Sequence, residues 1–249
     1  MSPAAVKEMA WLLMLIPFGI VLGIGCFFIY CAWRRAAMTE KPDVASLPAN
    51  SPFRSWPFDQ PGRWIAVKAT NPAVVQAALN LNRPTPCSWE EGLAEAREDK
   101  LFISPPVRGW VLVVGPGLPE PAEDVDSCYR FLADLSRKLG HLQFFSVSRV
   151  VNYHCWALME RGRVFRAYAW AGETLWNQGP LTAAEKELGL VCFGYDSEHN
   201  PLANRDVLNA NSERVNQLAA RWSVDPGAIS PDNWNGRGIV GEFSHSEPR

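Results

Sequence analysis

The stretch 142-LQFFSVSRVVNYHCWALMERGRVFRAYAWAGETLWNQ-178 is the part of this chain that decides its fold. It holds the densest run of β-branched and aromatic residues in the sequence. Short turn signals at Ser148-Arg149, Arg161-Gly162 and Ala171-Gly172 divide it. Segments of this length, separated by such short turns, are typical of antiparallel strands joined by hairpins. The sequence therefore predicts a meander of about four strands.

The central hairpin of this meander admits two registers, which differ in the length of the loop. A two-residue loop, Arg161-Gly162, would mix apolar and polar side chains on both faces of the hairpin. A three-residue loop, Glu160-Arg161-Gly162, separates the two kinds of side chain and places Gly162 at the left-handed position of a bulged turn. We therefore expect the three-residue loop.

This register gives the hairpin one apolar face and one face that mixes aromatic and polar residues. The apolar face would carry Tyr153, Cys155, Ala157, Met159, Phe165, Ala167 and Ala169. On the other face, Trp156 would lie opposite Arg166 and His154 opposite Tyr168. Trp, Tyr and Arg are enriched where proteins bind partners. We predict that this face is a binding site made of Asn152, His154, Trp156, Arg166, Tyr168 and Trp170. The alternative is that a second layer, such as a C-terminal helix with Trp222, covers it.

The remaining segments predict helices and strands that complete a domain around the meander. The expected strands are 64–69, 101–104 and 109–114, and the expected helices are 72–81, 89–99, 125–139, 183–189 and a last one capped by Ser212. The helix over 125–139 has a continuous apolar stripe, and Gly140 follows it as a stop signal. The expected fold class is α+β: an antiparallel sheet with helices mainly on one face, preceded by one N-terminal transmembrane helix.

Residues 9–33 contain no charged residue, and this length is sufficient for a helix across about 30 Å of hydrocarbon. Arg34 and Arg35 follow at once, which predicts a single-pass protein of the inner (plasma) membrane with its C-terminal domain in the cytoplasm. Gly19 and Gly23 have the GxxxG spacing that allows two helices to form a homodimer. The expected organisation is a flank at 1–8, the span at 9–33, a Pro-rich linker at 34–61, the folded domain at 62–223 and an irregular tail at 224–249.

Composition and motif spacing argue against several classes of function. The formal net charge is −2 and no long Lys/Arg run occurs, so we expect no nucleic-acid partner. The turn Gly115-Pro116-Gly117 lacks the third glycine of a dinucleotide loop, and acidic residues follow it. The cysteines form no CxxC pair and the histidines no i, i+4 pair, so we expect free buried thiols, no metal site and no cofactor.

Two functions remain after these exclusions. The first is a membrane-anchored binding module, immunity-like or a scaffold, that presents the aromatic-polar face to a protein partner. The alternative is a membrane-tethered hydrolase with a pocket based on His154 or Cys87. His154 and Cys155 cannot act as a pair, because adjacent residues of a strand point to opposite faces. The sequence therefore favours a binding module over an enzyme.

Overall fold

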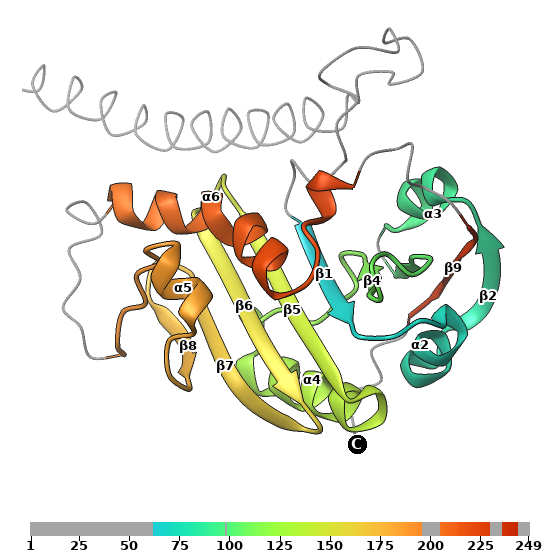
Figure 1. Ribbon diagram of the computed structural model, residues 1–249, viewed down its shortest axis with the longest axis horizontal. Coiled ribbons are helices and arrows are strands. Elements are labelled where there is room, and N and C mark those ends of the chain that lie inside the picture. Colours follow the sequence, from blue (N-terminus) through green and yellow to red (C-terminus); the bar gives the residue numbers. More distant parts are fainter. Residues whose placement is uncertain (1–61, 98, 196–204, 230–235, 244–249) are drawn as a thin grey trace, which may run out of the picture. The chain divides into compact units, whose positions relative to one another are not determined.

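Nine strands form one sheet, in which every neighbouring pair runs antiparallel (Figure 1). The strand order is β2-β9-β3-β4-β1-β5-β6-β7-β8, and helices cover the sheet. This computed structural model describes residues 62–97, 99–195, 205–229 and 236–243. The predicted α+β class and the antiparallel sheet are confirmed.

The predicted meander makes up one half of the sheet. Its strands are β5 (His141–Ser148), β6 (Tyr153–Glu160), β7 (Arg163–Trp170) and β8 (Thr174–Gln178). The first strand of the domain, β1 (Gly62–Val67), pairs with β5 and so joins the meander to the other half. Strands rich in apolar and β-branched residues occupy the centre, where both faces of the sheet are covered.

The structure corrects the predicted loop of the β6–β7 hairpin. Glu160 pairs with Arg163, so the loop is the two-residue turn Arg161-Gly162. Both turn residues have positive φ, 47° for Arg161 and 82° for Gly162, as the tight hairpin turn with matching twist requires. A glycine is favoured at the second position because its backbone reaches this region without strain.

A bulge in β7 then shifts the pairing by one more residue. Trp156 therefore lies opposite Tyr168, and His154 lies opposite Trp170. The turn and the bulge together displace the register by two residues, which is one side-chain period. The predicted faces therefore hold beyond the bulge, although the predicted cross-strand partners are wrong. At the bulge itself, the prediction that Phe165 lies on the apolar core face is wrong, because this residue is 51% exposed.

The other half of the sheet contains two strands that the sequence did not predict. Its members are β2 (Asn82–Cys87), β9 (Gly238–Glu242), β3 (Lys100–Ile103) and β4 (Val111–Val114). The prediction of an irregular tail over 224–249 is wrong, because β9 pairs with both β2 and β3 and a 3-10 helix forms at Pro226–Ala228. The strand β2 lies at the sheet edge, which is where its two prolines are tolerated.

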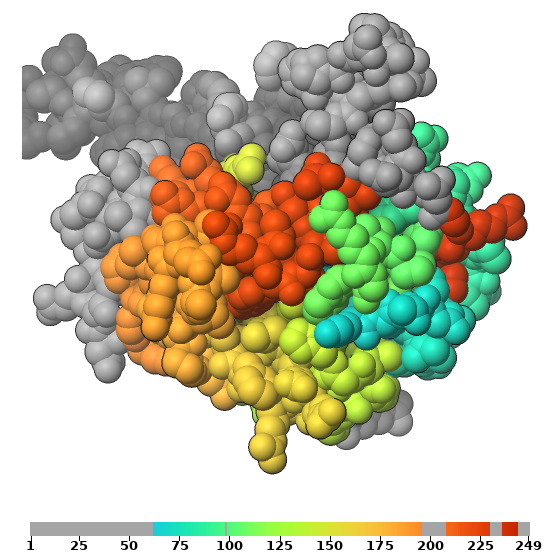
Figure 2. Space-filling view, viewed as in Figure 1, coloured from blue at the N-terminus to red at the C-terminus, as the bar shows by residue number. Residues whose placement is uncertain are grey.

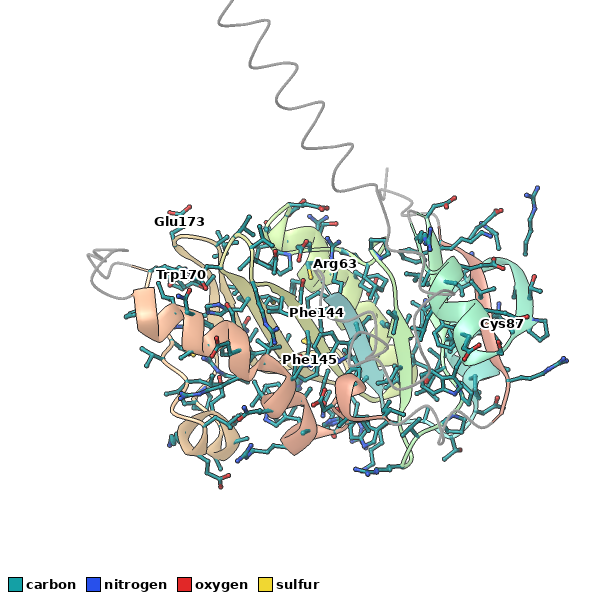
Figure 3. All side chains as sticks on the ribbon, turned by 90° about the horizontal axis from the view of Figure 1, so that it is seen from above. Arg63, Cys87, Phe144, Phe145, Trp170 and Glu173 are labelled. Carbon is teal, nitrogen blue, oxygen red and sulfur yellow. The ribbon has the colours of Figure 1, made fainter. Side chains whose placement is uncertain are left out.

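Helices cover both faces of the sheet, whereas the sequence predicted them mainly on one. One face packs against α2 (Pro72–Leu79) and α4 (Val125–Leu139), and the other against α3 (Trp89–Glu95), α5 (Ala183–Glu187) and α6 (Arg205–Trp222). In the space-filling view, α5 and α6 lie over much of the meander (Figure 2). The neighbours Phe144 and Phe145 of β5 accordingly belong to two different cores (Figure 3).

The last helix begins earlier than the sequence predicts. The predicted cap was Ser212, but α6 begins at Arg205 and Ser212 is a buried residue within it. A serine inside a helix can bond to the carbonyl four residues before it, and Ser212 Oγ lies 3.5 Å from the Leu208 carbonyl oxygen. This placement turns Ser212 towards the sheet.

Several predictions concern residues outside the described ranges. These are the flank at 1–8, the transmembrane helix at 9–33 with Gly19 and Gly23, and the linker at 34–61. In the part of the chain that the structure describes, no helix combines the length and the hydropathy needed to cross a bilayer.

Candidate functional site

The predicted binding face lies under a second layer. The side chains of His154, Trp156 and Tyr168 are completely buried, and those of Arg166 and Trp170 are 1% exposed. They face α5, α6 and the segment around Phe193, whose ring lies 5.5 Å from that of Trp170. The predicted exposure of this face is therefore wrong, and the alternative of a covering helix with Trp222 holds.

A buried carboxylate organises the polar groups of this covered face. Glu185 Oε1 accepts hydrogen bonds from Arg166 Nε at 2.7 Å and from Trp156 Nε1 at 2.8 Å. Its other oxygen accepts from the backbone and hydroxyl of Thr182, which completes a capping box at the start of α5. Arg166 Nη1 donates to Asn177 Oδ1 at 2.7 Å and to nearby carbonyl oxygens. These hydrogen bonds join α5 to the sheet, while Arg166 Nη2 is buried without a hydrogen-bond partner among the described residues.

The hydrogen bonds around His154 fix which ring nitrogen carries the proton. The amide of Asn211 is oriented by two bonds to the backbone of Val191, at 2.7 and 3.1 Å, so its NH₂ group faces His154 Nε2 at 3.3 Å. Nε2 therefore accepts, and Nδ1 donates its proton to Ser212 Oγ at 3.0 Å. The hydroxyl of Ser212 in turn donates to Asn152 Oδ1 at 3.0 Å.

This arrangement prevents His154 from acting as a base towards Ser212. A general base must present a free lone pair to the hydroxyl that it deprotonates, whereas His154 presents an N–H. Burial also lowers the pKa of His154 to about 3, so the ring is neutral at physiological pH. His154 is therefore a structural residue that links β6 to α6.

The described cysteines are free thiols, as predicted, and burial suppresses their acidity. Burial is the largest cause that raises the pKa of Cys87 to about 11 and that of Cys192 to about 12. The pKa values of Cys128 and Cys155 are also raised well above the ordinary range by burial. Because the thiolate is the reactive form, these side chains are poor nucleophiles at neutral pH. Within the described ranges, no three His, Cys, Asp or Glu side chains gather closely enough to hold a metal ion.

The turn between β5 and β6 presents the most exposed large apolar side chains among the described residues. Val150 is 78% exposed and Val151 is 69% exposed. Asn152, a half-buried member of the predicted site, ends this turn with a positive φ of 50°. Its side chain accepts the hydrogen bond from Ser212 Oγ, which ties the turn to α6. The two valines are therefore held out in water by a fixed turn.

The sequence does not predict this turn as a site. Its turn signal is Ser148-Arg149, and it predicts the two valines as part of the meander. The available signal is that β-branched apolar residues occupy Val150 and Val151, at a turn where polar residues or glycine are usual. Comparisons with family models, with curated proteins and with solved structures give no match to this chain.

Proposed function

We propose that this protein is a membrane-anchored binding module that captures a protein partner on its β5–β6 turn. The exposed pair Val150 and Val151 carries the proposal, because adjacent apolar side chains fixed in water are suited to desolvation by a partner. The link from Asn152 to Ser212 holds the turn in one conformation, which reduces the entropy lost on binding.

The membrane part of the proposal rests on the sequence. The uncharged stretch 9–33 would span the inner membrane, and Arg34 and Arg35 would keep the folded domain in the cytoplasm. Pairing of two spans through Gly19 and Gly23 would make the module a homodimer with two capture surfaces.

The hydrolase alternative receives less support from the described residues. His154 points its proton at Ser212, and Cys87 has a pKa of about 11 because it is buried near Glu91 and Glu95. Neither residue has the activated state that nucleophilic catalysis needs. A binding role requires only that His154 and Cys87 contribute to the stability of the fold.

Site-specific photocrosslinking in native membranes tests partner capture. The full chain would carry p-benzoylphenylalanine at Val150, with a matched chain carrying it at Val74 of α2, which is 52% exposed. We expect a discrete adduct from position 150 and none from position 74. Val151→Asp should lower the adduct yield about fivefold or more, the effect of losing an interface hot spot. Equal adducts from both positions, or none from position 150, would reject the β5–β6 turn as the capture surface.

A further inference from the structure

Five basic side chains gather at the end of the sheet where the β6–β7 turn meets the last turn of α4. We call this group the basic tip, and its members are all exposed: Lys68, Arg137, Lys138, Arg161 and Arg163. The basic tip and the β5–β6 turn lie at opposite ends of the meander, because successive hairpin turns fall at opposite ends of their strands (Figure 1). The basic tip therefore shares no residue with the proposed capture surface.

Hydrogen bonds hold the elements of the basic tip together. The N–H of Gly162 donates to Ser136 Oγ at 2.8 Å, which fixes the β6–β7 turn to the last turn of α4. The N–H of Lys68 donates to the His141 carbonyl oxygen at 3.0 Å, which places the end of β1 beside the start of β5. Because neighbouring strands lie about 4.8 Å apart, the cations on these elements face the solvent as one group. Their fixed arrangement reduces the entropy lost on binding.

The basic tip carries more positive charge than nearby carboxylates neutralise. Asp134 pairs with Arg137 at 2.5 Å, and Glu160 lies opposite Arg163 across the hairpin. The other four cations of the tip form no ion pair with a described acidic residue. The chain as a whole has a formal net charge of −2, so this positive charge is a local concentration. Such a patch attracts an anionic partner.

Helix stability accounts for only part of this charge. Arg137 and Lys138 stand in the last turn of α4, where cations stabilise the helix dipole, and Lys138 Nζ donates to the Ala78 carbonyl oxygen at 3.1 Å. Arg161 and Arg163 belong to the hairpin and cap no helix. The turn requires a positive φ at Arg161, where asparagine or glycine is usual, so the backbone does not favour arginine there. The two arginines therefore indicate a role outside the fold.

We propose that the basic tip docks on the anionic surface of the membrane that anchors the chain. The proposal rests on the membrane anchor of the proposed function, because a tether keeps the domain at a high effective concentration near the bilayer. The attraction of a few Lys and Arg side chains to an anionic leaflet then suffices to orient the domain. The expected linker, 34–61, could extend over about 90 Å, which exceeds the width of a domain of this size. Either end of the domain can therefore reach the bilayer.

Docking at the basic tip would determine which way the capture surface faces. Gly62, the first residue of β1, follows the linker and pairs with Val147 near the β5–β6 turn, at the other end of the sheet. The segment before α4 at that end carries Glu120, Glu123 and Asp124, which an anionic leaflet would repel. Both charge groups favour an orientation in which the β5–β6 turn faces away from the bilayer, towards a cytoplasmic partner.

Relaxation of methionine methyl groups by a paramagnetic lipid tests this orientation. The sequence has five methionines, and Met159, at the end of β6 beside the basic tip, is the only one after residue 38. Val150→Met adds a reporter at the opposite end. The full chain, with ¹³C in its methionine methyl groups, would be placed in nanodiscs that contain a trace of gadolinium-labelled lipid. The nanodiscs consist of phosphatidylcholine alone or of equal parts phosphatidylcholine and phosphatidylglycerol. The Met159 signal is assigned by its loss in Met159→Leu.

The two reporters should respond differently to anionic lipid. In nanodiscs with phosphatidylglycerol, we expect the Met159 methyl to relax at least about threefold faster than the methyl introduced at position 150. In neutral nanodiscs, or in anionic ones at about 1 M salt, the two rates should converge, because the attraction is absent or screened. This comparison uses the unaltered basic tip, so it does not depend on the folding of a charge variant.

Charge variants then test the location. Arg161→Glu with Arg163→Glu should reduce the excess relaxation of Met159 about threefold or more. Arg83→Glu with Arg97→Glu is the matched control: it changes the net charge equally at exposed positions in the other half of the sheet, and it should leave the excess unchanged.

Several results would overturn the proposal. These are equal Met159 rates in neutral and anionic nanodiscs, no loss with the altered hairpin arginines, and an equal loss in the matched control. If the basic tip served a nucleic acid or an acidic protein instead, anionic lipid would not change the Met159 signal. A chain that does not enter the nanodiscs would reject the membrane anchor and this proposal with it. Photocrosslinking from position 150 reads partner capture separately, so capture and docking can fail independently.

Discussion

His154 shows how burial decides what a reactive type of residue can do. In the sequence it is a candidate base beside a cysteine, and in the fold it is a neutral ring between Asn211 and Ser212. The strand period correctly separates it from Cys155, but no sequence pattern places Asn211 and Ser212 against it. Those contacts depend on how α6 crosses the sheet, which is a tertiary property.

The neutral state of His154 predicts how stability changes with pH. Its pKa is about 3 in the folded chain and about 6.5 when unfolded, so between these values only the unfolded chain binds the proton. Stability therefore falls as the pH decreases below 6.5. From pH 7 to pH 5 we expect a loss of about 2 kcal/mol in the free energy of unfolding, measured by urea denaturation.

The variant His154→Gln isolates this contribution. It should be less stable than the parent at pH 7 but should lose less stability on acidification, because it lacks the titrating ring. His141→Gln is the control: burial also lowers the pKa of His141, but that ring is only half buried, and most of the slope should remain. Equal slopes in His154→Gln and the parent would contradict a neutral, buried His154.

At the scale of elements, the short helix α5 is held to the sheet by one buried ion pair. Arg166 and Glu185 are 1% and 0% exposed, and their atoms Nε and Oε1 lie 2.7 Å apart. Losing one partner of such a pair leaves a charge buried without compensation. We expect Glu185→Gln, which keeps the shape and the cap, to lower the free energy of unfolding by about 3 kcal/mol or more in urea titrations.

A second acidic residue of α5 provides the matched control. Glu187 pairs with Arg221 at 3.3 Å, but the two side chains are 65% and 41% exposed. Glu187→Gln should therefore change stability by less than about 1 kcal/mol. Similar effects of the two substitutions would mean that the Arg166–Glu185 pair does not hold α5 in place.

Local patterns predicted most of the elements, and they failed where distant contacts decide. The apolar stripe and the stop at Gly140 gave the helix over 125–139 with its bounds, and the turn signals gave the meander. The predicted hairpin register was wrong, because the hairpin has a shorter loop than predicted and a bulge in β7. The predicted and the observed register place most side chains on the same faces of the sheet, so the sorting of apolar and polar residues could not distinguish them. Six residues were predicted as an exposed face because the sequence cannot show that α5 and α6 fold over it.

At the scale of the molecule, the sheet depends on a strand from the far end of the chain. Val240 in β9 pairs with Thr85 of β2 on one side and with Phe102 of β3 on the other. The sequence 238–242 is short and contains two glycines, so propensity alone does not indicate a strand. Its place between two strands supplies the hydrogen bonds that stabilise it, and it connects β2 to the rest of the sheet.

A chain that ends at Ser223, the predicted limit of the folded domain, should therefore fail to fold cooperatively. It would lack β9, so the backbone groups of β3 that face β9 would lose their partners, and β2 would lose its neighbour in the sheet. Circular dichroism during urea titration should show no cooperative transition for this chain. The full chain with Val240→Ala should still unfold in one transition, with a loss of about 1–3 kcal/mol from truncating a buried side chain. If the shortened chain unfolded at the same urea concentration as the full chain, β9 would be an accessory to the sheet, and the folded domain would end where the sequence pattern first placed its limit.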